Sequence, residues 1–166
     1  DLGVRLVGPV HFSNKDLADP ATDPKGTEWH GLSPLGKALV AEANRLGIVI
    51  DASHASDLAF DQMLQLSTTP IILSHSGAKA VFNHPRNIDD ARIRALAAKG
   101  GVIQTNSYSD YMVRVPETPE LDAEIRALNQ KYGPYRLLAG DTFRSYVRER
   151  RAIGRCSGRA GRDCRW

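Results

Sequence analysis

The chain has 166 residues, of which 42% are hydrophobic and 25% charged, a composition typical of a globular protein with a core. This length suits one domain and is short of the roughly 250 residues of a closed (β/α)₈ barrel. No apolar run reaches the about 18 residues that a membrane span needs, so no transmembrane segment is expected. The net charge of +3 is uneven, because eight of the arginines lie between Arg144 and Trp166.

The first elements are predicted from residue 4 onward. Residues 4–11 form a short apolar run that ends in His11, which predicts a strand. Residues 13–31 are rich in Gly, Pro, Asp and Lys, and this length is typical of a functional loop. A helix is then predicted with Ser33 as its N-cap, Pro34 in its first turn and Gly47 after its end.

The middle of the chain alternates between predicted strands and helices. Apolar, β-branched runs alternate with helical periodicity, and Ser56 and Asp89 are predicted N-caps. The predicted strands are 48–54, 71–76 and 102–106, and the predicted helices are 57–67, 90–100 and 121–133.

This alternation predicts an α/β fold. About four strands are each followed by helical sequence, and strands that are apolar on both faces are typical of a parallel sheet covered by helices. We therefore expect about four parallel strand-helix units with right-handed crossovers.

The last segment has a different composition. Near Gly154 the apolar periodicity gives way to Arg and Gly, and both cysteines, Cys156 and Cys164, lie here without a CxxC spacing. Such a segment can bury little, so residues 146–166 are predicted to be a disordered or aberrant tail after a domain at 1–145. An abnormal terminus, such as translation out of frame, is favoured over an arm that binds nucleic acid.

Two histidines end neighbouring predicted strands. His54 closes the strand 48–54 and His75 lies at the end of the strand 71–76. Ligands collect at the carboxyl ends of parallel strands, which lie about 4.8 Å apart when adjacent. Two imidazoles at this spacing can share one Zn²⁺, and His11, which also ends a strand, can reach the same edge.

Other polar residues have simpler interpretations. His30 and His84 lie in predicted loops, where exposure to solvent is the default. Arg86 follows Pro85 and is either a solvated loop residue or a side chain suited to a bidentate grip on a carboxylate. The HExxH motif is absent, which excludes a helix-borne zinc protease site.

Several segments together resemble the membrane (renal) dipeptidase family of zinc metallopeptidases. The resemblance lies in GLSPLGKALVAEANRLGIVIDASHAS, PIILSHSGAKAVFNHPRNIDD and LAAKGGVIQTN, with HFSNKDLAD upstream, and it extends over roughly residues 3–145. It implies a partial TIM-like (β/α) barrel and a hydrolase that cleaves dipeptides with two zinc ions.

The resemblance also implies roles for individual residues. His54 and His75 match the two histidines that bind one zinc, and Arg86 matches the arginine that holds the carboxylate of the substrate. His11 matches the histidine that contacts the substrate and polarises the tetrahedral intermediate. The family's HxD pair, bridging Glu and GxDxDG segment have no counterpart here, so we expect at most one partial zinc site and a fragment that is inactive alone.

Partners and location are expectations of the same kind. A dipeptide substrate is expected and nucleic acid is not, and open sheet edges allow a homo-oligomer. The alternative function is a non-catalytic domain whose Arg-rich tail binds nucleic acid. The compartment stays open, although relatives that are exported allow a periplasmic or membrane-associated protein.

Overall fold

The structure, a computed structural model, describes residues 3–113, 118–133 and 138–157. For residues 154–157 only the backbone is described. The chain divides into two compact units, Asp1–Val113 and Arg114–Trp166, and each is described by itself.

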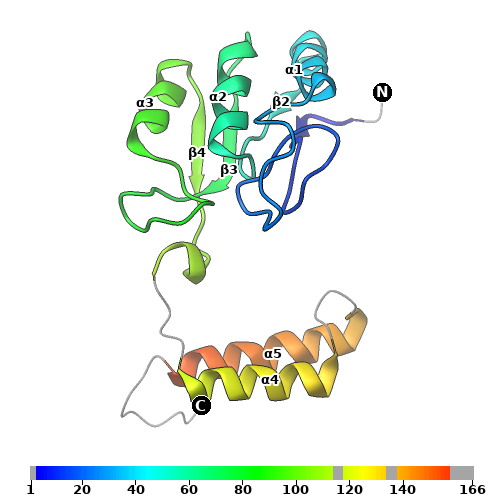
Figure 1. The fold of residues 1–166 in the computed structure, drawn as a ribbon, viewed down its shortest axis with the longest axis vertical. Coiled ribbons are helices and arrows are strands. Elements are labelled where there is room, and N and C mark those ends of the chain that lie inside the picture. The colour runs from blue at the N-terminus through cyan, green and yellow to red at the C-terminus, as the bar shows by residue number, and fades with distance from the viewer. Residues whose placement is uncertain (1–2, 114–117, 134–137, 158–166) are drawn as a thin grey trace. The chain divides into compact units, whose positions relative to one another are not determined.

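In residues 3–113 the first unit has four strands, and all their pairings are parallel (Figure 1). β1 pairs with β2, β3 pairs with β4, and a single parallel bridge between Asp51 and Ile72 joins the two pairs. The strands are β1 (Leu6–Val7), β2 (Val49–Ile50), β3 (Ile72–Ser76) and β4 (Val102–Thr105). The predicted α/β class with parallel strands is thereby confirmed.

Three helices alternate with these strands and begin at the predicted caps. The side chain of Ser33 accepts a hydrogen bond from the backbone of Gly36, and Ser56 and Asp89 do the same for the next two helices. Gly47 ends the first helix in the left-handed conformation with φ of 68°, which glycine adopts without strain. The helices are α1 (Pro34–Leu46), α2 (Asp57–Leu66) and α3 (Asp90–Ala98).

Two strands are shorter than predicted. β1 ends at Val7, because Pro9 has no N–H to donate to a ladder, and His11 therefore lies in the following loop. β2 ends at Ile50, and beyond it the carboxylate of Asp51 accepts hydrogen bonds from the backbone N–H groups of Ser53 and Ser74. His54 consequently lies in the turn before α2 rather than in a strand.

The core of the first unit lies where the helices meet the strands. Its most buried large residues come from α1, α2, α3, β2 and the position just before β3: Val40, Ile50, Met63, Ile71 and Leu96. Other strand residues, among them Leu6 and Val102, are about half exposed. The helices thus cover one face of the strands within the described part of this unit.

The loop between β1 and α1 is organised around a buried carboxylate. Asp19 is fully buried and accepts hydrogen bonds from the backbone N–H groups of Glu28, Trp29 and Gly31 at 2.8 to 2.9 Å. Burial opposes ionisation of Asp19, but these three donors outweigh it and lower the pKa of the carboxyl. The long loop is therefore a folded part of the unit.

The second unit is a helical hairpin. α4 (Pro119–Tyr132) confirms the helix predicted at 121–133, and it packs on α5 (Gly140–Ser157) through Leu121, Leu128 and Tyr146. The predicted boundary at 145 falls inside α5, which continues to residue 157 where disorder was expected. Residues 158–166 of the predicted tail lie outside the described residues.

The short 3-10 helix η1 (Ser109–Tyr111) follows β4 at the end of the first unit. Among the helices of the described ranges, none is both long and apolar enough to cross a membrane.

Candidate functional site

The two histidines predicted as metal ligands face each other. β3 carries His75, the turn after β2 carries His54, and their Nε2 atoms are 2.8 Å apart. The ring centroids are 4.8 Å apart, and the ring planes meet at 61°. The backbone bond from Ala52 N to Ile72 O, at 2.9 Å, keeps the two segments side by side.

Both imidazoles are neutral at physiological pH. Burial and then the nearby charge of Arg86 lower the pKa of His54 to about 3. The same two causes, in the same order, lower the pKa of His75. A neutral imidazole keeps a lone pair on one ring nitrogen, which is the form that binds a metal ion.

His11 joins this pair from the loop after β1. Its ring centroid lies 4.0 Å from that of His54, with the planes tilted by 38°. Phe12 meets His54 edge-on at 4.8 Å. His11 itself is exposed to solvent, so the structure brings the three predicted histidines together with His11 on the open side.

Arg86 is buried beside the histidines. Arg86 is only 3% exposed, and its Nη2 donates a hydrogen bond to the backbone oxygen of His75 at 3.2 Å. Burial lowers the pKa of Arg86, although Tyr111 and Asp51 oppose this effect. Within the described ranges the buried Nε has no hydrogen-bond partner, and no carboxylate there forms an ion pair with this guanidinium.

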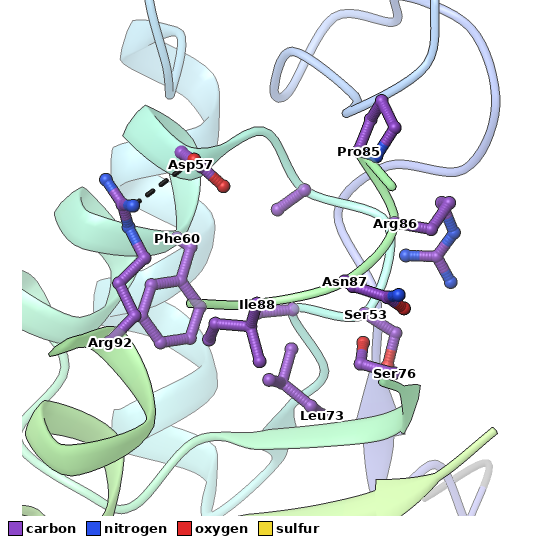
Figure 2. A pocket seen from close by; sticks show the side chains of 12 residues that line it. Ser53, Asp57, Phe60, Leu73, Ser76, Pro85, Arg86, Asn87, Ile88 and Arg92 are labelled. Carbon is purple, nitrogen blue, oxygen red and sulfur yellow. Dashed lines mark hydrogen bonds and ion pairs between the residues drawn. The ribbon is translucent and has the colours of Figure 1, made fainter. Parts of the chain in front are cut away.

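The segment that carries Arg86 lines a small cavity. Figure 2 shows Arg86, Asn87 and Ser53 gathered at one end of this cavity, while Phe60, Ile88 and Leu73 lie at the other end. Its volume of about 20 Å³ is sufficient for about one water molecule. The cavity is therefore too small for a substrate.

Tyr111 is a contact that the sequence did not identify. The guanidinium carbon of Arg86 lies 5.6 Å from the centroid of its ring, which is a cation–π distance. Asn87 Nδ2 donates to the backbone oxygen of Tyr111 at 2.7 Å and ties η1 to the loop that carries Arg86. A tyrosine 25 positions after an arginine has no local spacing that would have marked it.

The two remaining predicted loop histidines differ from each other. His30 is exposed as expected. His84 is half-buried instead, because its ring packs on Tyr111 at 4.5 Å and its Nδ1 accepts the backbone N–H of Arg86 at 3.0 Å. His84 therefore helps to shape the loop that positions the arginine.

The donor set fits zinc only in part. Two imidazole Nε2 atoms that converge on each other are the nitrogen donors that Zn²⁺ takes in proteins. Within the described part of the chain, however, no group of three or more His, Cys, Asp or Glu side chains is placed to hold a metal ion. The site therefore offers two ligands of a larger set.

Comparisons with known proteins agree on one family. A family model described as membrane dipeptidase, peptidase family M19, matches residues 1–136. An uncharacterized dipeptidase of Schizosaccharomyces pombe is 38% identical over 125 residues, which are 75% of this chain and 30% of that protein. Dipeptidase 3 of Mus musculus is 38% identical over 106 residues, which are 62% of this chain and 22% of that protein.

Solved structures give the same result. The probable dipeptidase PvdM of Pseudomonas aeruginosa matches with a TM-score of 0.65 and 30% identity, over 91% of this chain and 42% of that one. A metallo peptidase of Rhodobacter sphaeroides, liganded with a phosphinate mimic of L-Ala-D-Ala, matches with a TM-score of 0.60 and 28% identity, over 78% of this chain and 39% of that one. The chain spans about a third or less of the length of these curated relatives.

Proposed function

Because the chain belongs to the membrane dipeptidase family, peptidase family M19, we propose that it supplies part of the active site of a zinc-dependent dipeptidase. The observation that carries this proposal is the pair of facing Nε2 atoms of His54 and His75, 2.8 Å apart. In this proposal the two imidazoles are the zinc ligands that the described residues supply. They form at most one partial zinc site.

Zinc, when bound, would supply an activated water and polarise the scissile carbonyl. The chain's own contribution is to keep both imidazoles uncharged and converging. Burial keeps His54 uncharged, since it lowers the pKa so far that the neutral form persists well below neutral pH. The backbone pairing between the segment after β2 and β3 keeps the two imidazoles converging.

Arg86 is proposed to hold the C-terminal carboxylate of the substrate. A buried guanidinium without a carboxylate partner in the described ranges is costly unless an anion arrives, and arginine can grip a carboxylate with two hydrogen bonds. Tyr111 packs against the guanidinium and limits its movement. The positive charge near His54 and His75 thus fixes one end of a short substrate.

His11 is proposed to contact the other reacting atoms. It lies on the exposed side of His54, where an approaching peptide would meet it first. From that position an imidazole N–H can donate to the oxygen on which negative charge develops. The phosphinate ligand of the Rhodobacter sphaeroides relative is a mimic of a dipeptide, which supports a dipeptide as the substrate.

We also propose that the four parallel strands are a segment of a TIM-like (β/α) barrel. The support is their alternation with α1, α2 and α3 and the exposed apolar residues on the other strand face. In a complete barrel such residues fill the interior. The alternative of an Arg-rich arm for nucleic acid gains no support, since the relatives described above are peptidases.

The test is a zinc titration of the full chain by calorimetry. We expect the chain to bind zinc, and His54→Ala and His75→Ala each to weaken binding at least about tenfold, because each removes one of two ligands. His30→Ala is the matched control, since His30 is exposed and outside the cluster. Equal losses in His30→Ala and His54→Ala, or no zinc binding at all, would contradict the proposal.

Hydrolysis is tested in the same samples with a dipeptide such as Gly-D-Ala. Two imidazoles without a carboxylate ligand are expected to give little or no turnover. Zinc-dependent cleavage by this chain that disappears in His54→Ala would show that two described ligands suffice.

A further inference from the structure

A chain of hydrogen bonds leads from a carboxylate to the side of His75 that faces away from His54. Ser74 Oγ lies 2.7 Å from His75 Nδ1 and also bonds to Asp51 Oδ2. Asp51 Oδ1 in turn accepts from Ser53 Oγ at 2.6 Å and from the backbone N–H groups of Ser53 at 3.0 Å and Ser74 at 3.1 Å. These groups form one continuous network between β2 and β3.

The protons in this network are assigned by the chemistry of its members. Burial opposes ionisation of Asp51, but the hydrogen bonds from Ser53 and Ser74 outweigh it and lower the pKa of the carboxyl. An ionised carboxylate can only accept, so each serine hydroxyl donates its single proton to Asp51. Ser74 Oγ is then left as an acceptor, and His75 Nδ1 must be the donor to it.

The consequence is a fixed tautomer of His75. With its proton on Nδ1, the imidazole presents a lone pair on Nε2, toward His54. His54 has no equivalent support, since its buried Nδ1 finds no hydrogen-bond partner among the residues that the structure describes. The two proposed ligands therefore differ: one is held in the metal-binding tautomer by the protein, and the other is not.

We propose that Asp51 and Ser74 are positioning residues that hold His75 in the Nδ1–H tautomer, with the Nε2 lone pair directed to the metal position. Groups that orient a metal-bound histidine are typically worth about 10- to 100-fold in metal affinity. This inference rests on the proposed zinc function for its purpose, but the tautomer itself exists in the metal-free chain and is measured there.

The experiment is nitrogen-15 NMR of the histidine side chains in the full, metal-free chain, followed by zinc titration. In the unmodified chain we expect His75 to carry its proton on Nδ1. In Asp51→Asn the oxygen of the amide keeps the position that accepts the backbone N–H groups, and its NH₂ faces Ser74. The serine then donates to Nδ1, His75 changes to the Nε2–H tautomer, and zinc affinity falls about 10- to 100-fold.

Serine variants supply a second, independent test. Ser74→Ala removes the acceptor for Nδ1–H and is expected to lose about tenfold in zinc affinity, and Ser74→Thr, which keeps a hydroxyl, is expected to restore it. Ser76→Ala is the matched control, because Ser76 is a buried serine of the same strand and outside the network. If Asp51→Asn does not fold, as judged by circular dichroism, the zinc affinities of these serine variants test the positioning role.

The outcomes separate the two proposals. An Nε2–H tautomer in the unmodified chain, an unchanged tautomer in Asp51→Asn, or equal zinc affinity in Ser74→Ala and Ser76→Ala would overturn the positioning role. A chain that shows the Nδ1–H tautomer and its loss in Asp51→Asn, yet binds no zinc, would overturn the proposed function and leave the tautomer assignment intact.

Discussion

At the residue scale, the candidate site joins side chains from four separate segments. His11, His54, His75 and Arg86 are spread over 76 positions of the sequence and meet at one end of the parallel strands. Their closeness has a cost, because a positive charge on either inner histidine would face the buried guanidinium. This cost predicts how the stability of the metal-free chain depends on pH.

The chain is expected to lose stability as the pH falls from about 6.5 toward about 5. His54 has a pKa of about 3 in the folded chain and an ordinary value of 6.5 when unfolded, so in this range the unfolded state binds more protons. The sign is therefore a loss on acidification, of at most about 1.4 kcal/mol per pH unit for one histidine. His75 and His84, whose pKa values are also lowered, act in the same direction.

Urea unfolding at several pH values measures this loss. The carboxyl groups of lowered pKa, such as Asp19 and Asp51, have ordinary values near 3.8 and contribute mainly below this window. His54→Gln should show a smaller slope than the unmodified chain between about pH 6.5 and about pH 5. The same slope in both proteins would mean that His54 does not cause the loss of stability on acidification.

At the element scale, most helices follow from local sequence, whereas the strand ends do not. Ser33, Ser56 and Asp89 mark their helices because a cap bonds to the backbone three positions away, which the sequence shows directly. The end of β2 depends on Asp51 bonding to Ser74, 23 positions later, and no local pattern contains that contact.

The same distinction explains which parts of the site were predictable. His54 and His75 stand near predicted strand ends, and the rule that ligands collect there was sufficient to pair them. Asp51 and Ser74 are common residue types whose role exists only once β2 and β3 are adjacent. Tyr111 depends in addition on the path of the chain after β4.

One arginine of α3 bonds to several carboxylates at the contact with α2. Arg92 of α3 binds Asp61 of α2 through two nitrogens, at 2.7 and 2.8 Å, and also contacts Asp57 at 3.2 Å and Asp89. The hydrogen bonds that Arg92 donates to the Asp61 carboxylate are the main cause that raises the pKa of Arg92. Figure 2 shows this side chain reaching from its helix toward Asp57.

Arg92→Met is expected to lower the free energy of unfolding by about 1 to 2 kcal/mol, because three carboxylates lose their shared partner at a partly exposed site. Urea unfolding measures the loss, which should shrink in about 1 M salt as the remaining repulsion is screened. Arg94→Met is the matched control, since Arg94 is exposed on the same helix. Equal effects of the two variants would exclude a special role for the Arg92 contacts.

At the scale of the whole molecule, apolar burial is unequal between the two units. The first unit has a continuous core that includes Met63, Ile71 and Leu96, each at most 1% exposed. In the second, the buried apolar side chains among the described residues are Leu121, Leu128 and Tyr146. Since burial of apolar surface is the main favourable term in folding, local stability should differ in the same order.

Hydrogen exchange under native conditions tests this difference. The backbone amides of β3 are expected to exchange only through large-scale opening, because Leu73 and the neighbouring Ile71 are buried in the core. The amides of α4 and α5 should exchange faster, through local opening of a hairpin with few buried side chains. Met63→Ala, which removes a fully buried side chain, should cost about 2 to 5 kcal/mol and accelerate exchange in β3. Equal protection of β3 and α4 in the unmodified chain would show that burial in the two units does not set their stability.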